Sequence, residues 1–289
     1  MKKYITAIIA ILSLATGCDN ILKHDKPTIA VSIEPLRYFV ERIAGDDFEV
    51  VSIIPEGASA ESYEPTPQNM RDAVASDLFL CIGLLDNERN MIEAAKADTT
   101  ARVIELYKSC ILMSPDGRYL TEGVDYSDSL RGIDPHVWIT PANGVRMSEK
   151  ITEALCELAP DNAARYRNNK VLFQNDIDLL YILAVTKAQD KHLPKAIIYH
   201  PALTYLADCC FFEQIAIEKE GKEPSAADIK EIIETGRKND VKRVFYQSQL
   251  NPESVKVIAD EIGATPTEFN PLASNWLLSL KTLIEQIYE

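Results

Sequence analysis

The chain is poor in positive charge for its size. Its 289 residues include 30 Lys and Arg against 44 Asp and Glu, which leaves a formal net charge of −14 at pH 7. Proteins that bind nucleic acid need a basic patch or stripe for the phosphates, so this composition argues against that class and favours cationic partners. Hydrophobic residues at 46% and charged residues at 26% are near globular averages, so the chain can fold around a core.

No segment is apolar for long enough to span a bilayer. The longest apolar stretch, Tyr4 to Leu14, has about eleven residues, whereas a transmembrane helix needs about 20. Two lysines precede it and small residues follow it, as in a secretory signal, and the small residues before Cys18 resemble a bacterial lipoprotein cleavage site. We expect a lipoprotein signal peptide at residues 1–17, lipidation of Cys18 and a tether over residues 18–26. The alternative is an ordinary signal peptide with a chance cysteine.

The cysteines lack the even number and regular spacing of a disulfide framework. Without Cys18, five remain: Cys81, Cys110, Cys156, Cys209 and Cys210. Cys81 falls in an apolar run and Cys156 on a helical pattern, so buried thiols are expected there. Cys209 and Cys210 would point about 100° apart on a helix, so a metal ion shared between them is not expected.

Short apolar runs alternate with helical patterns in both halves of the chain. Strands are predicted at residues 28–33, 48–54, 77–83 and 102–106, and again at 196–199, 212–217 and 241–246. Helix signals lie between them, such as the capping box Ser225-x-x-Asp228 and the Asn251-Pro252 start of a helix that ends at Gly263. The fold class is therefore α/β, with two lobes that each contain a mainly parallel sheet flanked by helices.

Glycine and proline are absent from the segment between the lobes. From Asp161 to about Lys191, apolar residues recur at helical spacing, which predicts one helix of about 45 Å or two helices with a break. A single helix would connect the lobes stiffly, unlike a flexible linker. We expect an N-terminal lobe at 27–160, a connecting helix at 161–192 and a C-terminal lobe at 193–289.

Histidine is scarce, but two of the four histidines lie where ligands bind in open α/β sheets. His136 stands before a helix expected near Pro141, and His200 follows the strand at 196–199. A single histidine in such a place is more often structural, but a cleft between the lobes would bring these two together at the carboxyl ends of strands. His24, in the tether, and His192 are expected to be exposed and uninvolved. Loops at 57–67 and 268–272 add carboxylate and amide oxygens, and this mixture suits zinc or manganese.

These segments resemble the solute-binding lipoproteins of zinc and manganese ABC importers, over essentially the whole mature chain. The motifs are Ser32-Ile33-x-Pro35-Leu36, Ile43-Ala44-Gly45-Asp46, Tyr63-Glu64-Pro65-Thr66-Pro67, Asp134-Pro135-His136-Val137-Trp138, His200-Pro201-Ala202, Tyr205-Leu206, Glu223-Pro224-Ser225 and Asn270-Pro271-Leu272. The resemblance implies two α/β lobes joined by one rigid helix, with a metal ion held between them by four side chains.

Motif by motif, the resemblance assigns His136 and His200 as metal ligands. Glu61 stands where members usually have histidine, and Asn270 stands where they commonly have aspartate; the His-rich loop of many zinc-binding members is absent from 108–131. Glu61 can still coordinate through oxygen, whereas an asparagine is a neutral, weak ligand. The expected ligands are Glu61, His136, His200 and Asn270, with Asn270 or a water in the fourth position. Zinc is favoured, with manganese or iron as alternatives.

The expected function is that of an extracytoplasmic receptor, anchored to the bacterial cell envelope through lipid on Cys18. It would be a monomer without enzyme activity that captures a divalent metal and delivers it to an ABC permease. One alternative is a metal-free adhesin or accessory lipoprotein of the same fold. Another is a metallohydrolase that uses Glu61, His136 and His200, although the chain has no His-Glu-x-x-His motif.

Overall fold

The computed structural model describes residues 26–98, 101–120, 130, 132–188, 193–219, 221–247, 249–250 and 253–289. The predicted signal peptide, Cys18, His24, His192 and the Asn251-Pro252 helix start lie outside these residues. Within the described part of the chain, no helix is long and apolar enough to cross a membrane.

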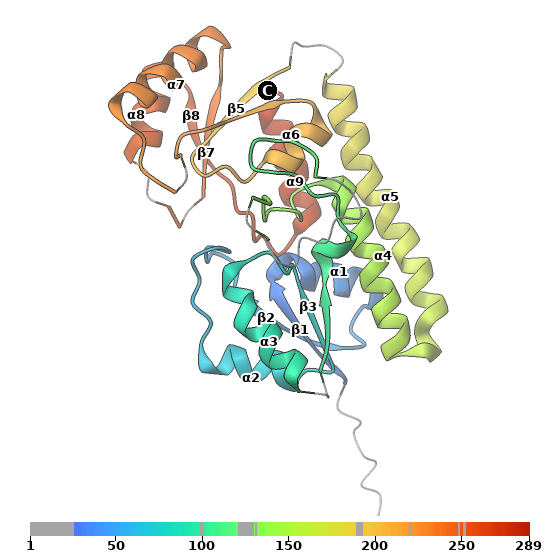
Figure 1. Ribbon diagram of the computed structural model, residues 1–289. Helices are drawn as coiled ribbons and strands as arrows, with labels where there is room; N and C mark the ends of the chain where they lie inside the picture. Colours follow the sequence, from blue (N-terminus) through green and yellow to red (C-terminus); the bar gives the residue numbers. More distant parts are fainter. Residues whose placement is uncertain are drawn as a thin grey trace, which may run out of the picture.

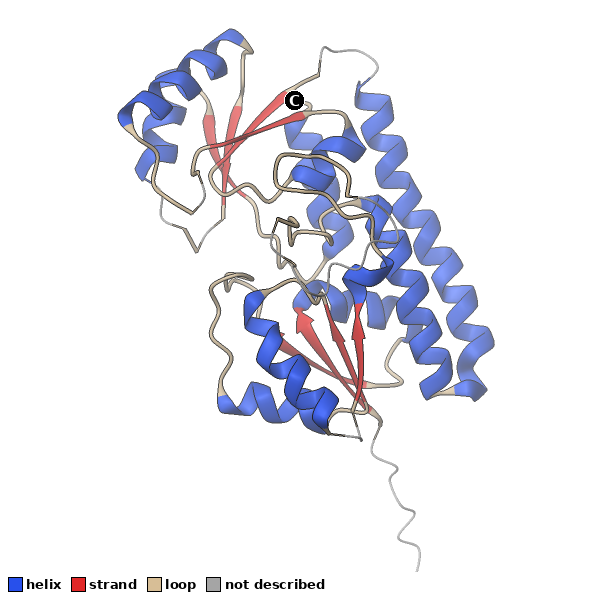
Figure 2. Ribbon diagram, in the orientation of Figure 1, coloured by secondary structure: helices blue, strands red, loops and turns tan. Residues whose placement is uncertain are grey.

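Two separate four-stranded parallel sheets form the framework of two lobes (Figure 2). Their strand orders are β2-β1-β3-β4 and β6-β5-β7-β8, so both sheets have the same topology. The strands are β1 (Thr28–Ile33), β2 (Glu49–Ile54), β3 (Leu78–Cys81), β4 (Arg102–Glu105), β5 (Lys195–Ile198), β6 (Glu213–Ala216), β7 (Arg243–Tyr246) and β8 (Thr265–Glu268). The sequence predicts all of them except β8, whose TPTE sequence has no apolar run and contains a proline that only an edge strand tolerates.

Helices cover both sheets, and the inner strands are buried on both faces, as in β3, whose four residues are all apolar and buried. They are α1 (Glu34–Ala44), α2 (Pro67–Ala75), α3 (Arg89–Ala97), α4 (Pro141–Leu158), α5 (Ala163–Ala188), α6 (Thr204–Cys210), α7 (Ala226–Lys238), α8 (Glu253–Ile262) and α9 (Trp276–Ile287). Short 3-10 turns occur at Asp86–Glu88, Leu106–Ser109 and Pro160–Asn162. The predicted capping box at Ser225 and Asp228 is present at the start of α7.

One continuous helix, α5, runs along the side of the molecule from the N-terminal lobe to the C-terminal lobe (Figure 1). Its 26 residues correspond to about 39 Å at 1.5 Å per residue. Over the described residues the structure therefore has the single helix rather than two helices with a break.

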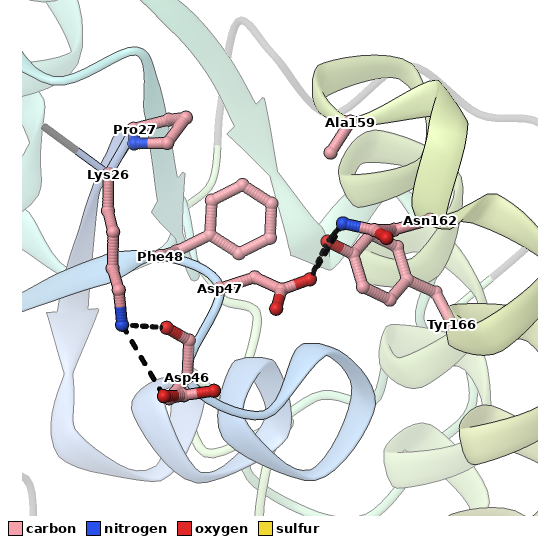
Figure 3. Close-up of a pocket in the computed structure, with 8 residues that line it drawn as sticks. All are labelled: Lys26, Pro27, Asp46, Asp47, Phe48, Ala159, Asn162 and Tyr166. Atoms are coloured by element: carbon pink, nitrogen blue, oxygen red, sulfur yellow. Dashed lines mark hydrogen bonds and ion pairs between the residues drawn. The ribbon is translucent and has the colours of Figure 1, made fainter. Parts of the chain in front are cut away.

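The start of α5 is fixed to the N-terminal lobe through Asp47, as Figure 3 shows. The Asp47 carboxylate accepts hydrogen bonds from the Tyr166 hydroxyl at 2.5 Å and the Asn162 amide at 3.0 Å, and it pairs with Arg165. Asp47, Asn162 and Tyr166 also border a shallow cavity of about 350 Å³ next to Lys26. The cavity lies at the amino ends of β1 and β2, whereas ligands of open α/β sheets bind at the carboxyl ends.

The two tryptophans join the lobes in one apolar core. The indole N–H of Trp138 donates to Pro271 O at 2.9 Å, and the indole N–H of Trp276 donates to Trp138 O at 2.7 Å. Trp276, on α9, also packs edge-on against Phe39 of α1, and all of these apolar side chains belong to a core that includes residues of both sheets. A second, smaller core lies wholly within the C-terminal lobe. Because the main core crosses the lobe boundary, the division at residues 27–160, 161–192 and 193–289 stays a proposal.

Candidate metal centre

Glu61 lies in the loop that leaves the carboxyl end of β2. The loop is held by the Asn87 side chain, whose amide donates to Ala60 O at 2.8 Å and to Tyr63 O at 3.0 Å. The Glu61 side chain is 40% exposed to solvent. The loop therefore presents one partly solvated carboxylate on a fixed backbone.

His136 is buried and oriented by its neighbour Asp134. The ring Nδ1 of His136 lies 2.9 Å from Asp134 Oδ1, and the backbone N–H of His136 donates to the same oxygen at 2.9 Å. Burial alone would raise the pKa of the Asp134 carboxyl, but hydrogen bonds from His136 outweigh burial and lower it below its ordinary value. An ionised carboxylate at Nδ1 keeps the proton on that nitrogen and leaves Nε2 free to bind a metal.

His200, just beyond the end of β5, has the same arrangement in the other lobe. Its Nδ1 lies 2.7 Å from Oε1 of Glu218, which follows the neighbouring strand β6. Burial lowers the pKa of His200, but the hydrogen bonds and negative charges of Glu61 and Glu218 overcome this and raise it to about 9. Without a metal, His200 is therefore an imidazolium at neutral pH, and a metal must displace its proton.

The structure brings Glu61, His136 and His200 together between the lobes. One ligand atom from each lies within 4.8 Å of the others. His136 Nε2 is 3.7 Å from one Glu61 oxygen, and His200 Nε2 is 3.4 Å from the other. The centroids of the two imidazole rings are 5.2 Å apart. Two imidazole nitrogens and one carboxylate, with both Nδ1 atoms held by carboxylates, form a set of three donors of the kind that binds a divalent metal such as zinc.

Asn270 uses both ends of its side-chain amide in other contacts. Its Oδ1 accepts a hydrogen bond from the backbone N–H of Leu272 at 2.9 Å, and its Nδ2 donates to Glu56 at 3.2 Å. These contacts close the turn after β8 and link it to the end of β2. The role of Asn270 as the fourth ligand stays a prediction.

The cysteines take no part in the three-residue cluster. Cys81, Cys110, Cys156, Cys209 and Cys210 are all free thiols. Cys81 and Cys156 are buried, as the sequence predicts, and burial raises the pKa of the Cys81 thiol well above its ordinary value.

Comparison with known proteins places the chain in a family. Residues 29–289 match the family model described as zinc-uptake complex component A, periplasmic, or ZnuA. The chain belongs to the ZnuA family. It is similar to the high-affinity zinc uptake system protein ZnuA of Bacillus subtilis (strain 168), with 25% identity over 86% of this chain and 80% of that protein. It also shares 24% identity with the zinc-binding lipoprotein AdcA of Streptococcus pneumoniae (strain ATCC BAA-255 / R6), over 95% of this chain and 56% of AdcA. The chain thus spans little more than half the length of that relative.

Solved structures agree with the ZnuA assignment. A crystal structure of ZnuA superposes with a TM-score of 0.79 and 31% identity, covering 91% of this chain and 98% of that one. The periplasmic zinc-binding protein TroA from Treponema pallidum shares the fold, with a TM-score of 0.75 at 18% identity over 91% of this chain and 98% of that one. The predicted family resemblance and the two-lobe fold with one long connecting helix are confirmed.

Sequence reasoning alone does not find the two carboxylates that orient the histidines of this ZnuA-family chain. Asp134 is visible in its motif, but nothing local shows that its side chain folds back onto His136. Glu218 carries a usable signal, because it is an acidic residue at the carboxyl end of a strand. Its contact with His200 depends on the pairing of β5 with β6, which cannot be predicted from the local sequence.

Proposed function

We propose that the protein is the extracytoplasmic receptor of an ABC importer for zinc. It binds the ion between its lobes through Glu61, His136 and His200 and delivers it to a membrane permease. The observation that carries this proposal is the convergence, within 4.8 Å, of a carboxylate and two imidazoles from opposite lobes. Membership of the zinc-uptake family and the names of the relatives support it.

The donor set favours zinc over manganese. Imidazole nitrogen suits zinc, whereas manganese prefers carboxylate, carbonyl and water oxygens in an octahedral site. Zinc also exceeds manganese and ferrous iron in affinity for a given site in the usual order of divalent metals. Glu61 in place of a third imidazole moderates this preference, so manganese and iron remain the competitors to measure.

The sequence before the described residues supports delivery at a membrane, because it predicts a lipoprotein signal peptide. We propose that lipid on Cys18 anchors the receptor and that residues 18–26 tether it near its permease. We expect the receptor to act as a monomer. It needs no nucleophile or general base, because it captures and releases the ion without chemical conversion. AdcA, one of the relatives, is named a lipoprotein.

Removal of the two imidazoles tests the proposal. We expect the metal-free mature protein to bind about one zinc ion, and His136→Ala with His200→Ala to weaken binding at least about 100-fold, because only one carboxylate remains of the three donors. Titration against a competing chelator with elemental analysis measures this. His192→Ala is the matched control and should bind like the unmodified chain. The proposal fails if the unmodified protein binds no zinc when zinc is added in excess, or if the double variant binds zinc as tightly as the unmodified protein.

A further inference from the structure

Gln247 and His200 each follow by two residues a paired position of the adjacent strands β7 and β5, at the carboxyl edge of the C-terminal sheet. In that sheet β5 stands between β6 and β7, and Ile198 of β5 pairs with Ala216 on one side and Phe245 on the other. Two residues further along, the same register places His200 between Glu218 and Gln247. The contact of 2.7 Å between His200 and Glu218 confirms that the register continues on the β6 side.

The side chains of His200 and Gln247 belong to the same face of the sheet. Side chains alternate between faces along a strand. Ile198 and Phe245 pack in the main core, which also includes the N-terminal lobe, whereas Ile197 and Val244 pack in the smaller core on the opposite face. Continued by two residues, this alternation assigns His200 and Gln247 to the face toward the N-terminal lobe. The edge between β5 and β7 is also where the strand order reverses, the usual ligand position in such sheets.

Among the residues that the structure describes, the buried Gln247 amide has no hydrogen-bond partner. The residue is 4% exposed, and neither its Oε1 nor its Nε2 has a hydrogen-bond partner among the described residues. Buried polar side chains in native proteins are nearly always paired, so each exception needs an explanation. Asn270, the amide that the sequence suggests as a ligand, has both ends engaged.

We propose that Gln247 belongs to the metal-binding centre and that its Oε1 is the fourth donor to the ion. This inference rests on the proposed function, because it completes the site of Glu61, His136 and His200. An amide oxygen is neutral, so the Glu61 carboxylate would supply the only negative charge among the four donors. A neutral and weak fourth ligand limits affinity, which suits a protein that must release its cargo.

Substitution of Gln247 by an apolar residue of similar size tests this donor. Gln247→Leu should weaken zinc binding about tenfold or more, and Gln247→Glu should tighten it, since a carboxylate attracts the cation more strongly than an amide. Visible absorption of the cobalt(II)-loaded protein should also change in Gln247→Leu, which reports coordination rather than folding. Ser254→Ala is the matched control, because it too removes a buried, unpaired polar atom and should alter neither affinity nor spectrum.

The outcomes separate this inference from the proposed function. If Gln247→Leu binds zinc like the unmodified protein with an unchanged cobalt spectrum, Gln247 is not a ligand, while loss of binding in the double histidine variant still upholds the receptor. If the unmodified protein binds no zinc, both proposals fall. A zinc-loaded crystal structure with Oε1 about 2.0–2.2 Å from the ion supports the assignment, whereas a water or Asn270 in that position overturns it.

Discussion

Each histidine of the site is placed between two carboxylates. His136 has Asp134 at Nδ1 and Glu61 at Nε2, and His200 has Glu218 at Nδ1 and the same Glu61 at Nε2. The carboxylate at Nδ1 fixes the tautomer and orientation of the ring, which normally raises the basicity of a metal ligand. The carboxylate at Nε2 is the one that would share the ion. The roles of the three acidic residues therefore follow from which ring nitrogen each one faces.

The raised pKa of His200 predicts a metal affinity that depends on pH well above the usual histidine range. Because the ring must lose its proton to bind, affinity should fall about tenfold per pH unit below about pH 9, so that at pH 7 it is about 100-fold weaker than at high pH. Zinc titrations in weakly coordinating buffers from pH 6 to pH 9 measure this slope. Glu218→Gln, which removes one of the charges that raise this pKa, should move the inflection to lower pH.

The same shift acts on the stability of the metal-free protein. A folded-state pKa of about 9 exceeds the ordinary value of 6.5. The interactions of the His200 imidazolium therefore stabilise the fold fully below about pH 6.5 and are lost as the pH rises through about 9. A zinc affinity that is constant from pH 6 to pH 9 would contradict a raised pKa of His200 in the metal-free protein.

Among the elements, α9 places the side chain of Trp276 tightly against Gly144 of α4. Gly144 is in the first turns of α4, and a Cβ atom built there would lie 2.5 Å from Cη2 of Trp276. The indole is held by its hydrogen bond to Trp138 O and by Phe39, so it has little room to move. Gly144 therefore makes room for the Trp276 indole rather than permitting a turn.

Gly144→Ala should therefore destabilise the protein. Overpacking of this kind costs roughly 1–3 kcal/mol, partly offset by the better helix propensity of alanine. Urea unfolding measures the change in free energy of unfolding. Gly236→Ala is the matched control, because its Cβ would first meet the flexible Cδ1 tip of Ile262 at 2.9 Å and should cost less. Equal stability of the two variants would show that Trp276 can shift.

The connecting helix shows how far periodicity predicts an element. Apolar residues predict a helix, and α5 is one, yet several of them, Val171, Leu172, Leu179 and Ile182, are exposed. The buried face is formed by Tyr166, Phe173, Ile177, Leu180 and Ala184. Apolar residues occur on both faces, so local pattern predicts the helix but not the side that packs.

For the whole molecule, the shared core predicts a small change of shape on metal binding. The tryptophan hydrogen bonds, the Tyr205 hydroxyl bond to Asp134 O at 2.8 Å and α5 all join the lobes. A wide hinge motion would break these contacts and expose core side chains. Closure is therefore expected to be limited to the ligand loops.

Zinc should stabilise the protein while leaving its overall dimensions unchanged. A ligand at 100 times its dissociation constant adds about 2.7 kcal/mol to the free energy of unfolding, so the thermal midpoint should rise. Small-angle scattering with and without zinc should give the same radius of gyration. A marked compaction on zinc addition would show that the lobes move as separate bodies and that the shared core opens.

The sequence by itself determined the features that depend on local pattern. Alternating apolar runs indicate two parallel sheets, the Gly-free and Pro-free segment after Pro160 indicates the long helix, and the positions of His136 and His200 at strand ends indicate the site. Each follows from side-chain periodicity, capping or turn chemistry within a short stretch of chain.

Only the tertiary structure decided which polar groups meet. Glu218 reaches His200 through the β5–β6 register, and Asn270 turns its amide toward Glu56 and Leu272. Strand β8, which has no apolar run of its own, is paired along its length with β7. These contacts join residues far apart in the chain, so their distances depend on sheet register and lobe packing, which local pattern does not encode.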